Sequence, residues 1–285
     1  MEIITISRGS FSHGKEIAER VAEILGYECI SREILLEASR FFHISERKLL
    51  KSLRDAPSFL DKITHGRGRE QYIAYIKAAL LEHVKKDGVV YHGHAGHLLI
   101  PEVAHALKVR IIADMDARVA LLMQKENMSS ADALAFIKDS DRNRAEWTRY
   151  LYKVDIEDPR LYDIIINIGG MKIEDVCTII CSTVRCEPFK TTPETKRALG
   201  DLALQSHISA ALQPICKAEV ISRDGFVHIK VPAQKLTETG YSSPQTRSQV
   251  HETIQIDLIK EITEIVNTIP GVKDVVCDVE KPYSS

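Results

Sequence analysis

The segment GSFSHGK, residues 9–15, combines residue types that bind phosphate with the spacing that this chemistry needs. Lys15 supplies an ammonium charge in the order G-x-x-x-x-G-K, in which backbone N–H groups surround the phosphates and the lysine reaches the outer ones. The next residue of such a loop is a Ser or Thr that binds Mg²⁺, but this chain has Glu16. The alternative is a strand-to-helix turn without a ligand. The predicted nucleotide contacts are Gly9, Ser10, Ser12, His13, Gly14, Lys15 and Glu16.

Such a loop must lead from a buried strand into a helix, because the N-terminus of a helix presents unpaired N–H groups and the positive end of the helix dipole. Residues 2–6, EIITI, form a β-branched run that predicts the strand. In residues 15–25, apolar side chains recur at helical spacing and predict an amphipathic helix. The sequence therefore places the loop between the two elements that it requires.

Strands and helices continue to alternate up to residue 185. Further strands are predicted at 88–93, 106–113 and 162–168, and helices at 32–42, 45–53, 69–86, 116–126, 130–138, from there to about 152, and 172–185. Strands separated by helices favour a parallel sheet that is covered on both faces. Residues 1–185 are therefore expected to form one three-layer α/β domain.

The composition changes at residues 186–200, where prolines and threonines without an apolar period predict a linker. A second domain, 201–285, is expected to follow as a small α+β unit. Its predicted elements are a helix at 201–212, a hairpin at 218–231 around an Asp-Gly turn, a loop at 232–250, a helix at 252–267 and a closing strand.

Residues 1–185 resemble the cytidylate kinase-like family, relatives of the bacterial nucleoside monophosphate kinases. The resemblance rests on ISR and FSHGKEI at the loop, on REIL at 32–35, and on the long block FIKDSDRNRAEWTRYLYKVDIEDPRLYDIIINIG. Glu16 is a family residue in this pattern, whereas Phe11 and His13 stand where the family has glycines. Ser31 stands at a family Asp, and His94 at a family Arg.

The resemblance implies a P-loop kinase-like fold that uses ATP and Mg²⁺ to phosphorylate a small acceptor. It suggests CMP or dCMP as the acceptor, or another small molecule, held near Ser31, Arg32 and His94 with Arg149. Phosphoryl transfer needs charge neutralised on several oxygens and water excluded, which kinases achieve with an arginine-bearing lid.

The long block places three arginines on one predicted helical segment. We expect Arg142 and Arg144 to act with Lys15 in catalysis. Arg142 and Arg149 are seven residues apart and should share a helical face. The alternative is a solvated helix whose acidic residues pair with the arginines.

Histidines at 92, 94 and 97 could bind zinc, but no cysteine or carboxylate closer than Glu102 completes a ligand set. We interpret this segment as a substrate loop and predict no protein-held metal site. Asp114 and Asp116 follow a predicted strand and could be metal carboxylates or helix caps. The six cysteines contain no C-x-x-C pair and are expected to be reduced thiols.

Residues 201–280 resemble a BON domain in ISAAL, VISRDGFVHIKV and IPGVKDVVCDV. This resemblance implies a binding or assembly module, so we expect self-association or an unknown macromolecular partner. The alternative is a structural appendage.

The 38 Lys and Arg residues nearly balance 40 Asp and Glu residues, so no overall field favours nucleic acid or an anionic membrane. No stretch approaches 18 apolar residues, and we expect a cytoplasmic protein without a transmembrane segment. Two functions remain from different classes. One is a phosphotransferase, and the other is a non-catalytic nucleotide sensor that reports to the C-terminal domain. A measurement of catalytic turnover distinguishes the phosphotransferase from the sensor.

Overall fold

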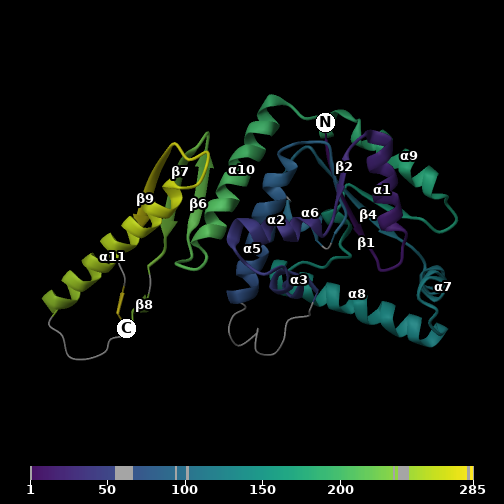
Figure 1. Ribbon diagram of the computed structural model, residues 1–285, viewed down its shortest axis with the longest axis horizontal. Coiled ribbons are helices and arrows are strands. Elements are labelled where there is room, and N and C mark those ends of the chain that lie inside the picture. Colours follow the sequence, from purple (N-terminus) through teal and green to yellow (C-terminus); the bar gives the residue numbers. More distant parts are fainter. Residues whose placement is uncertain are drawn as a thin grey trace. The chain divides into compact units, whose positions relative to one another are not determined.

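The computed structural model describes residues 2–54, 67–93, 95–100, 103–233, 235–236, 244–280 and 283–284. The chain divides into two compact units, Met1–Lys196 and Arg197–Ser285. Each unit is built around its own sheet, and each is described by itself (Figure 1).

The sheet of the first unit is parallel throughout, with the strand order β2-β3-β1-β4-β5. Its strands are β1 (Ile3–Arg8), β2 (Glu28–Ile30), β3 (Val89–Tyr91), β4 (Ala106–Ile112) and β5 (Ile164–Asn167). The sequence pattern missed β2, because three residues are too short to show a period. The predicted α/β class with a parallel sheet is confirmed.

Helices cover both faces of this sheet, as the alternation of side chains along β1 requires. Ile4 and Ile6 enter a core with α1 (Gly14–Leu25) and α9 (Ile173–Val184) on one face. Thr5 points to the opposite face, next to α6 (Gly96–Leu99). A Cβ atom added at Gly96 would lie 3.5 Å from the Cβ of Thr5. Figure 1 shows α1 and α9 side by side next to the sheet.

The remaining helices of the first unit lie between β2 and β3 or between β4 and β5 in the chain. They are α2 (Glu33–Phe42), α3 (Glu46–Arg54), α5 (Arg67–Val84), α7 (Met115–Glu126) and α8 (Ser130–Tyr152). The residues from 130 to 152 form one continuous helix. It begins after Ser129, whose hydroxyl accepts a hydrogen bond from the N–H of Asp132.

Helix α10 (Pro193–Leu212) begins inside the segment predicted as a linker. The reason is a local start signal that the composition obscured. The N–H of Thr195 donates to the hydroxyl of Thr192, the N–H of Thr192 donates to the hydroxyl of Thr195, and Pro193 occupies the first helical position. Within residues 186–200, only the part before Pro193 lacks α-helix, and it contains a 3₁₀ turn at Glu187–Phe189.

The second unit carries a three-stranded sheet in the order β6-β7-β9. Strands β6 (Glu219–Arg223) and β7 (Phe226–Val231) form an antiparallel hairpin, and β9 (Asp274–Val279) pairs parallel to β7. The hairpin turns at Asp224 and Gly225, both with positive φ. Helix α11 (Pro244–Asn267) packs on β9, and it extends into the segment predicted as a loop. Two short strands, β8 (Lys235–Leu236) and β10 (Tyr283–Ser284), pair separately.

Among the described residues, none of the helices combines the length and apolar character needed to cross a bilayer.

Candidate functional site

The predicted phosphate loop is a tight connection between the end of β1 at Arg8 and the start of α1 at Gly14. The N–H of Gly9 donates to the carbonyl of Ile111 in β4 at 3.3 Å, which anchors the loop to the neighbouring strand. The hydroxyl of Ser12, which is fully buried, donates to the carbonyl of Gly9 at 2.9 Å. The loop is thus closed on itself, and it leads directly into the N-terminus of α1.

Phe11 and His13 keep the backbone conformation that glycine would adopt at these positions. Both have φ of 58°, in the left-handed region that costs an L-residue about 1–2 kcal/mol. Contacts of their side chains offset this cost. The Phe11 ring packs edge-on against Phe136 with ring centroids 6.1 Å apart, and Nδ1 of His13 lies 2.5 Å from the carboxylate of Glu16. Phe11 and His13 thus hold the left-handed conformation that glycine adopts readily.

The carboxylate of Glu16 has two partners, one for each oxygen. Nζ of Lys125, in the last turn of α7, lies 2.7 Å from one carboxylate oxygen, and His13 contacts the other. These contacts, the Lys125 hydrogen bond first, hold the pKa of Glu16 below its usual range. The carboxylate is therefore an internal partner of the loop and not a free negative charge facing a nucleotide.

Lys15 extends into solvent from the first turn of α1. Its Nζ lies 3.6 Å from Glu19, and both side chains are more than half exposed. An exposed pair of this kind contributes only about 0.3–0.5 kcal/mol, so the ammonium group can turn toward a phosphate at little cost.

Helices α7 and α8 hold the loop from the other side. The buried Arg118 donates from Nε to the carbonyl of Ser10 at 2.7 Å and from Nη2 to Asp141 at 2.6 Å. The hydroxyl groups of Ser10 and Ser140 lie 2.7 Å apart. The segment predicted as an arginine-bearing lid is thus docked against the phosphate loop.

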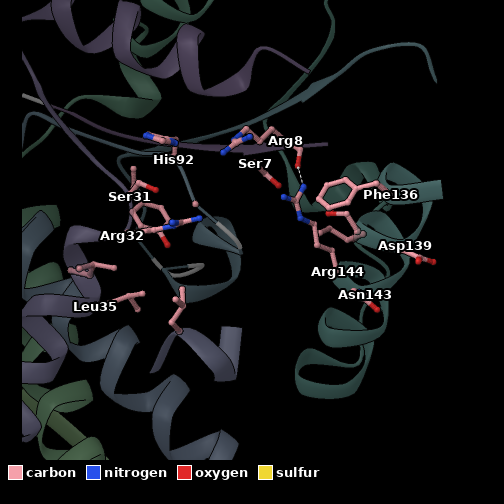
Figure 2. A pocket seen from close by; sticks show the side chains of 16 residues that line it. Ser7, Arg8, Ser31, Arg32, Leu35, His92, Phe136, Asp139, Asn143 and Arg144 are labelled. Atoms are coloured by element: carbon pink, nitrogen blue, oxygen red, sulfur yellow. Dashed lines mark hydrogen bonds between the residues drawn. The ribbon is translucent and has the colours of Figure 1, made fainter. Parts of the chain in front are cut away.

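A pocket of about 680 Å³ opens at the carboxyl ends of β2, β3 and β1, which are neighbours in the sheet (Figure 2). Ser31 and Arg32 directly follow β2, His92 follows β3, and Arg8 ends β1. Ligands of open parallel sheets bind at this edge, because the loops that diverge there leave a crevice. Across the pocket from these residues lies α8.

Helix α8 presents one face to the pocket. Its lining residues recur at helical spacing: Phe136, Asp139, Ser140, Asn143 and Arg144. Arg144 reaches inward, and its Nη1 donates to the backbone carbonyl of Arg8 at 2.9 Å (Figure 2). Arg142 lies outside the set of lining residues, is mostly exposed and pairs with Asp139 at 2.6 Å. Arg149 is also exposed and outside that set.

The structure therefore brings together Ser31, Arg32 and Arg144 of the predicted acceptor and catalytic residues, but not Arg142 or Arg149. His94 lies outside the described residues. The sequence reasoning placed His92 in a substrate loop without giving it a role of its own, and it did not single out Arg8 or Asn143 as site residues. Arg8 and His92 each stand at the carboxyl end of a strand, and that position is the signal that could have identified them.

The electrostatics of the pocket are dominated by cations. Burial, and then the charge of Arg8, lowers the pKa of Arg144 to about 10. Burial, and then Arg8, lowers the pKa of His92 to about 4, so its imidazole is neutral at pH 7. The Nδ1 atom of His92 has no hydrogen-bond partner among the described residues. The arrangement is suited to a ligand that carries negative charge.

A smaller pocket of about 380 Å³ opens on the other side of the loop, over the carboxyl ends of β4 and β5. Phe11 and His13 of the loop form one wall, and Ala113, Ile168 and Met171 form others. The lining is mostly apolar. It is shaped by strand ends that flank β1 on the side opposite the larger pocket.

His97 is not part of either pocket. It is 2% exposed, and its ring lies 4.5 Å from that of Tyr162. Within the described part of the chain, no group of three or more His, Cys, Asp or Glu side chains is arranged to hold a metal ion. Glu102, the carboxylate weighed for a zinc set, lies outside the described residues.

Comparison with known proteins gives one family. A sequence model of the cytidylate kinase-like family matches residues 3–169. Cytidylate kinases from Thermoplasma acidophilum and Thermoplasma volcanium are 23% and 26% identical to this chain. Each match covers 64% of this chain, and it covers 91% and 90% of those proteins.

Two further similarities differ in extent. An uncharacterized protein of known structure from Eubacterium ventriosum superposes with a TM-score of 0.50 at 19% identity, over 65% of this chain and 98% of that one. It shares the fold. A uronate isomerase from Corynebacterium glutamicum is 32% identical over 97 residues. That match covers 34% of this chain but only 19% of the isomerase, so the chain spans less than a fifth of that relative's length.

Proposed function

This chain belongs to the cytidylate kinase-like family, and from that premise we propose that it is an ATP-dependent phosphotransferase acting on a small acceptor. The observation that carries the proposal is the position of the phosphate loop. It leaves β1 between a cationic pocket over β2 and β3 and a mostly apolar pocket over β4 and β5. A donor and an acceptor bound in the two pockets would meet at the loop.

The smaller pocket would take the base of the nucleotide, since flat heterocycles suit an apolar lining with a few polar groups. The phosphate chain would then run along the N–H groups between Gly9 and Gly14 at the mouth of α1. Lys15 would turn from Glu19 to the outer phosphates. Glu16, which is paired with Lys125 and His13, would not repel them.

The larger pocket would hold the acceptor, with Ser31 and Arg32 on one side and Arg144 on the other. CMP or dCMP is the acceptor we would test first, because the relatives are cytidylate kinases and the pocket is cationic. The acceptor oxygen forms a bond to the γ-phosphorus, the bond from that phosphorus to the bridging oxygen breaks, and ADP leaves with the electron pair. Positioning and charge neutralisation supply most of the catalysis.

Mg²⁺ would be held mainly by the phosphates, as is usual for this ion. Asp114 fits the role of a protein carboxylate that assists in holding the ion. It follows β4, its carboxylate makes no capping bond to α7, and it accepts a hydrogen bond from Asn167 at 3.3 Å. Glu16 does not fit, since Lys125 and His13 occupy both of its oxygens. When bound, the ion would neutralise phosphate charge.

The experiment is a turnover assay with ATP, Mg²⁺ and a panel of nucleoside monophosphates and other small acceptors, with ADP as the readout. We expect one acceptor class to raise ADP formation well above the rate without acceptor. Lys15→Ala should weaken ATP binding at least tenfold, while Lys138→Ala, at an exposed position of α8 that lines neither pocket, serves as the surface control. No acceptor-dependent rate with any panel member would exclude the phosphotransferase.

A second function stays open because α7 and α8 already contact the loop. The bonds from Arg118 to Ser10 and to Asp141 would transmit nucleotide occupancy to α8 without any transfer. ATP binding without turnover would favour such a sensor.

The resemblance of residues 201–280 to a BON domain and its expected self-association stay predictions, since the family match ends at residue 169. The open sheet face of this unit carries Ile221, Phe226 and Val276, all more than a third exposed. Measuring the solution mass over a range of concentrations tests whether the chain associates.

A further inference from the structure

Arg8 is the last residue of β1, and it stands directly before the phosphate loop. Its backbone carbonyl accepts the hydrogen bond from Arg144. Its side chain crosses the start of α1: a Cβ added at Gly14 would lie 2.4 Å from Cδ and 2.7 Å from Cβ of Arg8. Gly14 therefore provides the path of the Arg8 side chain as well as a close approach for phosphate.

The guanidinium of Arg8 lies at the boundary between the loop and the larger pocket. Its stem packs on the first residue of α1, where the donor phosphates would bind, and its end lines the pocket with Arg32 and Arg144 (Figure 2). Strand β1 and the space over Gly14 fix the position of the Arg8 side chain, so this position does not depend on movement of α8.

Arg8 has no anionic partner in the part of the chain that the structure describes. No carboxylate among the described residues lies within ion-pair distance of it, and burial, followed by the charge of Arg32, lowers the pKa of Arg8. The carboxylate that lines the pocket, Asp139, is already paired with Arg142. A partly buried cation that lies near like charges and has no anion is unfavourable, and a bound anion relieves the repulsion.

We propose that Arg8 is a catalytic residue that binds the phosphoryl group during its transfer between the loop and the acceptor pocket. The inference rests on the proposed function. A guanidinium has a planar fork that can contact two phosphoryl oxygens at once, which suits charge that is spread over several oxygens. Arg8 takes no part in bond making. It neutralises oxygens of the phosphoryl group as that group moves from ATP to the acceptor oxygen.

The kinetic test compares three variants. Arg8→Met keeps an apolar stem over Gly14 and removes the charge, and Arg8→Lys keeps the charge without the fork. Arg20→Met is the matched control, because Arg20 is exposed on α1 and pairs with Glu23. We expect Arg8→Met to lower kcat at least about 100-fold with a much smaller change in the KM for ATP. Arg8→Lys should restore part of kcat, and Arg20→Met should stay near wild type.

A second measurement does not require an acceptor. We would measure the melting temperature, Tm, with and without inorganic pyrophosphate. The wild-type Tm should rise with the anion. Arg8→Met should show a much smaller rise, and its Tm without the anion should equal or exceed that of the wild type, because an uncompensated cation has been removed. A merely structural Arg8 would instead give a lower Tm and an unchanged response to pyrophosphate.

The outcomes separate the two proposals. If the wild type transfers phosphate and Arg8→Met has the same kcat, the proposed role of Arg8 is wrong, but the proposed phosphotransferase activity is supported. No wild-type transfer, with a pyrophosphate response that depends on Arg8, would exclude the enzyme and keep Arg8 as an anion-binding residue. A pyrophosphate response that is equal in wild type and Arg8→Met, or absent from both, would overturn the proposal for Arg8 whatever the turnover.

Discussion

Arg118 ties the phosphate loop, α7 and α8 together, so the coupling between Arg118 and Asp141 should be larger than that of a surface ion pair. The Nη2 of Arg118 lies 2.6 Å from Asp141, and the side chains are 10% and 35% exposed. Removing one partner of a fully buried pair costs about 3–5 kcal/mol, and an exposed pair contributes less than about 1 kcal/mol. This pair is half-buried, so we expect Asp141→Asn to lower the free energy of unfolding by about 2 kcal/mol.

Arg118→Met should cost about 3 kcal/mol, because the bond from Nε to Ser10 is lost as well. The double variant should cost less than the sum, which leaves a coupling energy of about 1–2 kcal/mol. Urea unfolding followed by the emission of Trp147 is the assay. Trp147 is the chain's single tryptophan and is buried in α8, so its emission reports the first unit.

Arg142 and Asp139, both in α8, supply the matched control. Their guanidinium and carboxylate groups also lie 2.6 Å apart, but the two side chains are 65% and 62% exposed. Their coupling should not exceed about 0.5 kcal/mol. If both cycles gave equal coupling energies within error, burial would not be what strengthens the contact of Arg118, and the reasoning would be refuted.

Two further predictions use the same unfolding assay. Burial lowers the pKa of His92 to about 4 and of His97 to about 3, whereas an unfolded chain takes up these protons near pH 6.5. The free energy of unfolding should therefore fall as the pH drops below 6.5, by about 1–2 kcal/mol for each histidine at pH 5. His97→Leu should make this decline shallower, and an unchanged slope would contradict the assignment. Gly14→Ala should cost about 1–3 kcal/mol, because its Cβ would collide with Arg8. Gly170→Ala, where an added Cβ meets no atom within 4 Å, should stay within about 0.5 kcal/mol, and equal effects of the two changes would count against the collision.

Spacing along the chain predicted the elements of the first unit well, because strand and helix periods are local properties. It also predicted the loop between the first strand and the first helix. It did not reveal β2, which is three residues long and pairs only with β3. The local start signal of α10 at Thr192 and Pro193 was present in the sequence but was interpreted as linker composition.

The face of α8 illustrates the limit of periodicity. Spacing alone placed Arg142 and Arg149 on one face, and both are exposed in the structure. A helical period says which residues lie together, but it does not say which face meets the pocket. The contact of Ser140 with Ser10 of the loop and the contact of Asp141 with Arg118 of α7 decide that, and they leave Arg144 turned inward.

By itself the sequence determined the α/β class and the position of the loop between the first strand and the first helix, because these depend on short-range pattern. Its resemblance to a known family indicated the kinase-like family. Only the tertiary structure decided what the loop's charged residues contact. Lys125 is 109 residues from Glu16, and Arg118 is 108 residues from Ser10, yet each is in contact with its partner. Separations of that size carry no periodic signal, and the parallel sheet order that brings such segments together is set by packing of the whole unit.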